Sequence, residues 1–110
     1  DNIFVVKNGV IHTPPRHAGI LDGITRRVVF ELAVSAGFTL VERQMTRYDL
    51  YVADELFLTG TAAEVVPVHQ YDERVIGTGK PGPVTQRLML DFRQLAESTG
   101  TPMYEDAKLS

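Results

Sequence analysis

The chain has 110 residues, of which 44% are hydrophobic, a length and composition ordinary for a single folded domain. Its net charge is only −3 and it has no basic run, which argues against nucleic acid or an anionic membrane as a partner. It contains no apolar stretch as long as a membrane span, and no cysteine for a disulfide or a thiolate metal site, which fits a cytoplasmic protein.

The beginning of the chain predicts a β-hairpin. Residues 3–7 and 10–13 are rich in β-branched residues, and Asn8-Gly9 between them is a strong signal for a tight turn. There is no initiator methionine, and Asp1 and Asn2 lead directly into the first strand. We therefore expect the C-terminal part of a longer protein, with a mature chain trimmed by processing as the alternative.

The middle of the chain predicts two helices. The first runs from Ile24 to about Ala36, because apolar residues recur at helical spacing at Ile24, Val28, Leu32, Ala33 and Ala36. Gly37 suits the position just beyond the helix end, and residues 38–44 then alternate as a strand. Residues 46–49 resemble a capping box that opens a short helix through Ala53.

The second half predicts further strands and a long helix. Residues 55–59 and 65–71 are strands, the latter turned by residues 72–73 into residues 74–76, and residues 77–82 form a loop. Pro83 suits the first turn of a helix to about Ala96, whose buried face carries Val84, Leu88, Phe92 and Leu95.

These elements predict the fold class and the division of the chain. Strands and helices are mixed and include a hairpin, which indicates an α+β, or mixed α/β, domain. The pattern fades toward the end of the chain, so we expect a folded region over residues 1–97 and a loose tail over residues 98–110.

Two loops are suited to holding an anion. Gly23 permits close approach to the free N–H groups of Ile24 and Thr25 at the positive end of the first helix, and Thr25 adds a hydroxyl. The small residues 59–63, Thr-Gly-Thr-Ala-Ala, can present successive N–H groups as an anion nest. An ordinary helix start and a simple connection between strands are the alternatives.

Other patterns are weaker. The segment Gly77–Lys80 lacks both the first glycine and the Ser or Thr of a P-loop. The three histidines have no metal-ligand spacing, so we expect surface or sheet positions for His12, His17 and His69. Asp54 and Glu55 are neighbours at a strand, so their carboxylates should face opposite ways and not share acid–base chemistry.

In order and spacing, the motifs resemble the C-terminal part of the large domain of a class IV aminotransferase, the pyridoxal-phosphate family of fold type IV. The matching segments are Asn2-Ile3-Phe4, Lys7-Asn8-Gly9, Thr13-Pro14-Pro15, Gly23-Ile24-Thr25-Arg26, Ala53-Asp54-Glu55, Thr59-Gly60-Thr61-Ala62-Ala63-Glu64, Pro67, and Lys80-Pro81-Gly82-Pro83 with Thr85. The forms Thr-Gly-Thr-Ala-Ala-Glu and Gly-Lys-Pro-Gly-Pro resemble branched-chain aminotransferases more than other branches. A D-amino-acid aminotransferase or aminodeoxychorismate lyase relative, and a non-catalytic domain that binds a phosphate-bearing ligand, are the alternatives.

The resemblance implies pyridoxal 5'-phosphate as the cofactor of the complete enzyme. It implies that the pyridine ring packs on Leu21 and that the phosphate is held by Gly23, Ile24, Thr25 and Thr61. It implies that Ala62 and Ala63 present backbone N–H groups to the substrate α-carboxylate. In the family, the lysine that bonds to the cofactor and the glutamate on the pyridine nitrogen lie upstream of Asn2, so no catalytic residue is expected in this chain.

The same resemblance implies the reaction and the partners. The complete enzyme would exchange an amino group between Leu, Ile or Val and 2-oxoglutarate, so its substrates would be amino acids and 2-oxo acids. The missing N-terminal part of the same enzyme would be the chain's first partner, and a homo-oligomer is expected. The chain alone should be inactive, because this chemistry needs an activated lysine amine.

Overall fold

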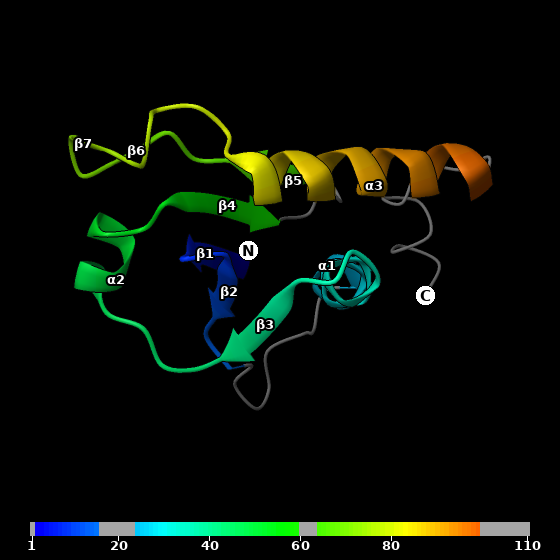
Figure 1. Cartoon of the computed structure of the whole chain (residues 1–110), viewed down its shortest axis with the longest axis horizontal. Helices are drawn as coiled ribbons and strands as arrows, with labels where there is room; N and C mark the ends of the chain where they lie inside the picture. Colours follow the sequence, from blue (N-terminus) through cyan, green and yellow to red (C-terminus); the bar gives the residue numbers. More distant parts are fainter. Residues whose placement is uncertain (1, 16–23, 60–63, 100–110) are drawn as a thin grey trace.

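The computed structural model of the chain describes residues 2–15, 24–59 and 64–99 (Figure 1). Within these ranges, five strands form one mixed sheet in the order β3-β2-β1-β4-β5, and two short strands form a second sheet. The strands are β1 (Asn2–Lys7), β2 (Val10–Thr13), β3 (Thr39–Glu42), β4 (Glu55–Thr59), β5 (Val65–Pro67), β6 (Gln70–Tyr71) and β7 (Arg74–Val75). The helices are α1 (Ile24–Ser35), α2 (Arg47–Tyr51) and α3 (Pro83–Thr99).

The main sheet separates two layers, as Figure 1 shows: α1 and α3 lie on one side, and α2 with the β6–β7 hairpin lies on the other. The alternation of side chains along β1 explains this arrangement. Phe4 and Val6 are buried in the core beneath α1 and α3, where the Phe4 ring stacks on Phe57 at 4.9 Å between centroids. Val5 points the other way, into a smaller cluster that includes Ile76. The predicted α+β fold is confirmed.

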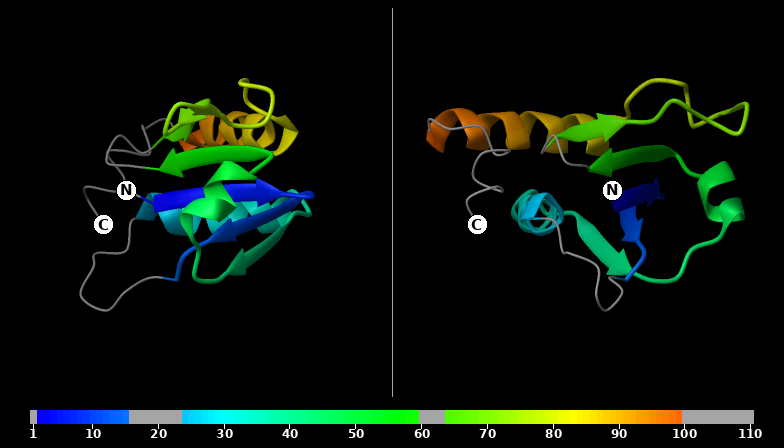
Figure 2. Two further views of the ribbon diagram at one scale, coloured as in Figure 1. Left: turned by 90° about the vertical axis from the view of Figure 1, so that its left-hand side faces the viewer. Right: turned by 180° about the vertical axis from the view of Figure 1, so that it is seen from behind.

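The strand directions place several chain ends at one edge of the sheet. β1 is antiparallel to β2 and β4, and β3 is parallel to β2, so β2, β3 and β4 all run in one direction. Figure 2 (left) shows their arrows pointing to the same side, opposite to β1. Because α1 connects β2 to the parallel β3, it begins where β2 ends. We call this region the carboxyl edge: Thr13 and Pro14, Glu42, Thr59 and the first turn of α1.

Two local predictions are confirmed in detail. The hairpin turn between β1 and β2 has positive φ at Asn8 (52°) and Gly9 (77°), the conformation for which Asn-Gly is selected. Helix α1 ends with Gly37 at φ 84°, and the N–H of Phe38 donates to the carbonyl of Ala33 at 2.9 Å. This is the hydrogen bond of a glycine-terminated helix end, and it turns the chain into β3.

The prediction of one strand over residues 65–71 is wrong. The segment divides into β5, which pairs with β4, and β6, which pairs with β7 in the second sheet. Pro67 ends the pairing because it has no N–H to donate, although the N–H of Val68 still reaches the carbonyl of Leu56 at 2.8 Å. The turn between β6 and β7, over residues 72–73, occurs where it was expected.

The helix bounds and faces differ slightly from expectation. α2 ends at Tyr51, and α3 continues to Thr99. On α1, Val28 and Ala33 are buried as predicted, but the fully buried Val29 was not expected on this face. Residues 100–110 lie outside the described residues, so the division into a folded region and a tail stays a prediction.

Candidate cofactor-binding site

Helix α1 presents its first turn at the carboxyl edge. The first N–H groups of a helix have no intrahelical partner, and the helix dipole is positive there, so Ile24 and Thr25 offer donors to an anion. Thr25 is only 7% exposed, which places its side chain within the fold. The structure thus puts these two residues at the helix start where the sequence predicted them. The other predicted site residues, Leu21, Gly23, Thr61, Ala62 and Ala63, lie outside the described residues.

Thr59 supplies an independent observation at the same edge. It is the last residue of β4, directly before the predicted nest at residues 60–63, and its side chain is completely buried. Its Oγ1 has no hydrogen-bond partner among the described residues. A buried hydroxyl without a partner is uncommon and calls for a ligand or another polar group beside it. Together with the helix N–H groups, a donor set of this kind fits a phosphate.

Arg26 is a residue of the carboxyl edge to which the sequence patterns assigned no role. Its side chain is 8% exposed, and its guanidinium lies 4.4 Å from the ring centroid of Phe30. One Nη donates to the carbonyl oxygen of Pro14 at 3.0 Å and to Oε2 of Glu42 at 3.2 Å. The only sequence signal for it was its place in the Gly-Ile-Thr-Arg motif.

Glu55 is a second residue that the patterns missed. Its buried carboxylate accepts hydrogen bonds from the first turn of α3, from Thr85 N–H at 2.7 Å and from Val84 N–H at 3.3 Å. The exposed Asp54 instead accepts from the N–H of Asn8 at 2.8 Å. The prediction that these two carboxylates do not act together is confirmed, and Glu55 serves as a helix cap.

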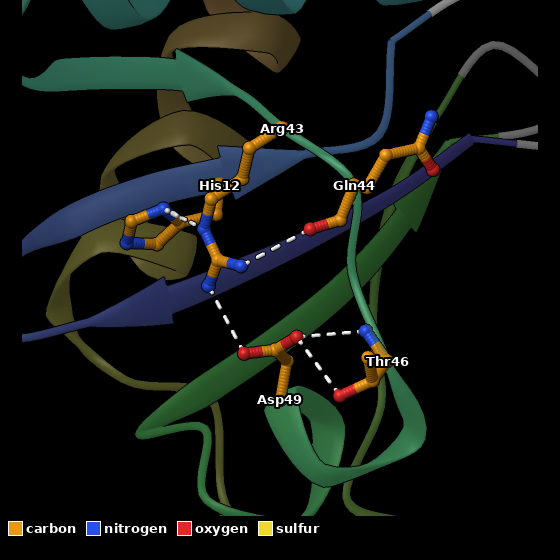
Figure 3. A network of polar contacts seen from close by, with 5 residues as sticks. All are labelled: His12, Arg43, Gln44, Thr46 and Asp49. Carbon is orange, nitrogen blue, oxygen red and sulfur yellow. Dashed lines mark hydrogen bonds and ion pairs between the residues drawn. The ribbon is translucent and has the colours of Figure 1, made fainter.

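A polar network lies on the opposite face of the sheet (Figure 3). Arg43 Nε donates to Nδ1 of His12 at 3.1 Å, and its Nη2 donates to Asp49 at 3.1 Å. Burial and the Arg43 charge lower the pKa of His12, whereas hydrogen bonds from Arg43 and from the backbone of Thr46 lower the pKa of Asp49. The expected sheet position of His12 is confirmed. The described residues contain no group of three or more potential metal ligands, and none of their helices is long and apolar enough to cross a membrane.

Residues 1–71 match the family described as amino-transferase class IV. This match covers more than half of the chain and includes both loops on which the resemblance was based. The chain therefore belongs to the class IV aminotransferase family.

Similar proteins within that family carry one activity in their names. The chain is 50% identical over 96% of its length to a putative branched-chain-amino-acid aminotransferase of Methanocaldococcus jannaschii, and 53% identical over 86% to a branched-chain-amino-acid aminotransferase of Pseudomonas aeruginosa. It covers 37% and 31% of those proteins, so it spans about a third of the length of the relatives it matches.

A solved structure confirms the fold type. The branched-chain amino acid aminotransferase of Thermobaculum terrenum, in its pyridoxal-phosphate form, superposes with a TM-score of 0.81 at 38% identity, over 88% of this chain and 32% of that one. Other branched-chain amino acid aminotransferases have been solved with N-(5'-phosphopyridoxyl)-L-glutamate and with 4-methylvaleric acid. The fold is that of a part of a fold type IV aminotransferase, a family in which pyridoxal phosphate is the cofactor.

Proposed function

We propose that this chain forms the phosphate- and carboxylate-binding part of a branched-chain aminotransferase. One observation carries the proposal: the free N–H groups at the start of α1 and the buried, unpartnered hydroxyl of Thr59 lie at the same edge of the sheet. An isolated helix start would not require a second donor, and a simple connection between strands would not leave a hydroxyl buried without a partner.

Each residue of the proposed site has a chemical task. The backbone N–H groups of Ile24 and Thr25, with the hydroxyls of Thr25 and Thr61, hold the phosphate, and Gly23 gives it close access to the helix start. Leu21 packs against the pyridine ring, and successive N–H groups at residues 62–63 orient the substrate α-carboxylate. When bound, pyridoxal 5'-phosphate supplies the electron sink for amino-group transfer.

The described lysines are badly placed for catalysis at this site. Lys7 is at the far end of β1 from the carboxyl edge, and its ammonium pairs with Asp54 at 3.5 Å. Five residues of strand separate Lys7 from Asn2, a distance of about 17 Å. Lys80 precedes α3, whose first turn is capped by Glu55 at that same far end. The covalent chemistry therefore requires a lysine outside the described residues, which we assign to an N-terminal part of the same enzyme.

The proposed reaction exchanges an amino group between Leu, Ile or Val and 2-oxoglutarate in the cytoplasm, within a homo-oligomer. Its support is the names of the similar enzymes and the two ligands seen in solved ones, a branched acid and a glutamate adduct. A relative acting on D-amino acids, an aminodeoxychorismate lyase relative and a non-catalytic phosphate-binding domain are the competing functions.

The test joins the N-terminal part of the Methanocaldococcus jannaschii relative to residue 1 of this chain. The chimera should transaminate L-leucine with 2-oxoglutarate and leave D-alanine untouched, while the 110-residue chain alone should do neither. Transamination by the chain alone would refute the assignment of the catalytic lysine to another segment. A chimera that binds the cofactor but prefers D-alanine would refute the branched-chain assignment.

A further inference from the structure

Arg26 is an unusual residue for the first turn of a helix. A cation at this end is opposed by the helix dipole, which favours negative charge there. The side chain is also almost fully buried, and a buried charge is costly unless it is paired. The contacts of Arg26 must therefore offset both terms, and they show what the residue holds in place.

The guanidinium connects three segments of the carboxyl edge. It reaches the carbonyl of Pro14, just beyond the end of β2, and the carboxylate of Glu42, the last residue of β3. Its own backbone belongs to the first turn of α1, and its plane is fixed by the ring of Phe30 one turn later. A planar guanidinium can satisfy such diverging acceptors, whereas an ammonium on a flexible stem defines its geometry less well.

We propose that Arg26 is a positioning residue for phosphate binding, which locks the first turn of α1 onto the ends of β2 and β3 so that the N–H groups of Ile24 and Thr25 face the phosphate. This inference rests on the proposed function. Arg26 donates to protein acceptors, so its effect on the anion is exerted through the helix start. Its positive charge at the same edge adds attraction for an anion, and the two contributions are separable by experiment.

The experiment measures the phosphate-dependent part of binding to the 110-residue chain. Calorimetric titration with pyridoxine 5'-phosphate and with pyridoxine gives two dissociation constants, whose ratio reports the phosphate site. Neither probe carries an aldehyde, so surface lysines cannot capture it. The variants are Arg26→Met, Arg26→Lys and Glu42→Gln, and the control is Arg27→Met, which removes the same charge from an exposed neighbour on the same helix.

Arg26→Met should reduce the phosphate-dependent ratio by about tenfold or more, because displacing a binding group by around 1 Å can cost up to about a hundredfold. Arg26→Lys should lose most of the same ratio although it keeps the charge. Glu42→Gln changes a half-exposed side chain, tolerated by the fold, and should reduce the ratio by about threefold, the loss of one charge-assisted hydrogen bond at the surface. Arg27→Met should match the wild type.

The outcomes separate the inference from the function beneath it. If the wild-type chain binds both probes equally, the proposed phosphate site fails and the role of Arg26 fails with it. If the wild type prefers the phosphate ester and Arg26→Met and Arg27→Met bind alike, only the role of Arg26 is refuted. If Arg26→Lys binds like the wild type, charge alone is sufficient and positioning is refuted. Should Arg26→Met fail to fold by circular dichroism, Glu42→Gln and Arg26→Lys decide the question.

Discussion

Substitution of Glu55 by glutamine should strongly destabilise the packing of α3 on the sheet. The carboxylate places one oxygen 2.7 Å from the N–H of Thr85 and the other 3.3 Å from that of Val84, in a buried setting. Glutamine keeps the shape but has one acceptor oxygen for two donors, and it removes the negative charge at the helix start. A β-carbon at Gly82 would lie 2.2 Å from the Glu55 side chain, so little room remains for the amide to reorient.

The magnitude follows from these contacts. A side-chain cap contributes about 1 kcal/mol. A buried charge at a helix end contributes up to about 2 kcal/mol, and a buried N–H left without a partner costs about 1–3 kcal/mol. These terms overlap, so Glu55→Gln should lower the free energy of unfolding by about 2–4 kcal/mol rather than by their sum.

Urea unfolding followed by circular dichroism at about 222 nm, where helices absorb, measures this loss. For a small domain whose free energy changes by about 1–3 kcal/mol per molar urea, the midpoint should fall by about 1–2 M. Glu31→Gln, an exposed carboxylate in the middle of α1, is the matched control and should stay within about 0.5 kcal/mol of the wild type. A Glu55→Gln variant as stable as that control would show that the cap does not hold α3.

Three further predictions concern backbone strain, pH and buried hydroxyls. Gly77→Ala should cost more than Gly9→Ala in urea unfolding, although both have positive φ, because a β-carbon at Gly77 would meet a backbone oxygen at 2.1 Å and one at Gly9 meets nothing within 4 Å; equal losses would contradict this. The folded-state pKa of His12 is lowered, so the unfolded chain binds more protons, and the free energy of unfolding should decrease as the pH falls below about 6.5. His12→Gln should flatten that slope in urea titrations between about pH 5 and 7, and an unchanged slope would assign it to other groups. Thr59→Val should leave stability unchanged or raise it by up to about 1 kcal/mol, whereas Thr13→Val, which removes a 2.7 Å hydrogen bond, should lower it by about 1 kcal/mol; the reverse order would show that the Thr59 hydroxyl has a partner.

Local chemistry made much of the fold predictable. Asn8-Gly9 fixes a hairpin, Gly37 ends a helix, and Pro83 begins one, and each signal acts over a few neighbouring residues. The division of residues 65–71 between two sheets was not predicted, because apolar alternation continues past Pro67 while the partner strand β4 does not. Which sheet a strand joins depends on its partners, and these are distant in sequence.

The candidate site divides in the same way. Ile24 and Thr25 were predictable because the helix start is a local property. Arg26 and Glu55 were not, because a polar residue on an otherwise apolar face gives no sign of the buried acceptors or donors it will meet. The resemblance to class IV aminotransferases came from the order of short motifs and not from any one of them. The roles of the residues in the turn 60–63 stay predictions.

The central claim is that this chain recognises the phosphate of pyridoxal 5'-phosphate without carrying the catalytic lysine. Its most direct test is a titration of the ¹⁵N-labelled chain with pyridoxine 5'-phosphate, followed through the amide resonances. The account predicts that the Ile24, Thr25 and Thr61 amides shift together with a single dissociation constant, and that pyridoxine lacking the phosphate leaves them in place. Shifts confined to other amides, or equal shifts with both probes, would contradict it.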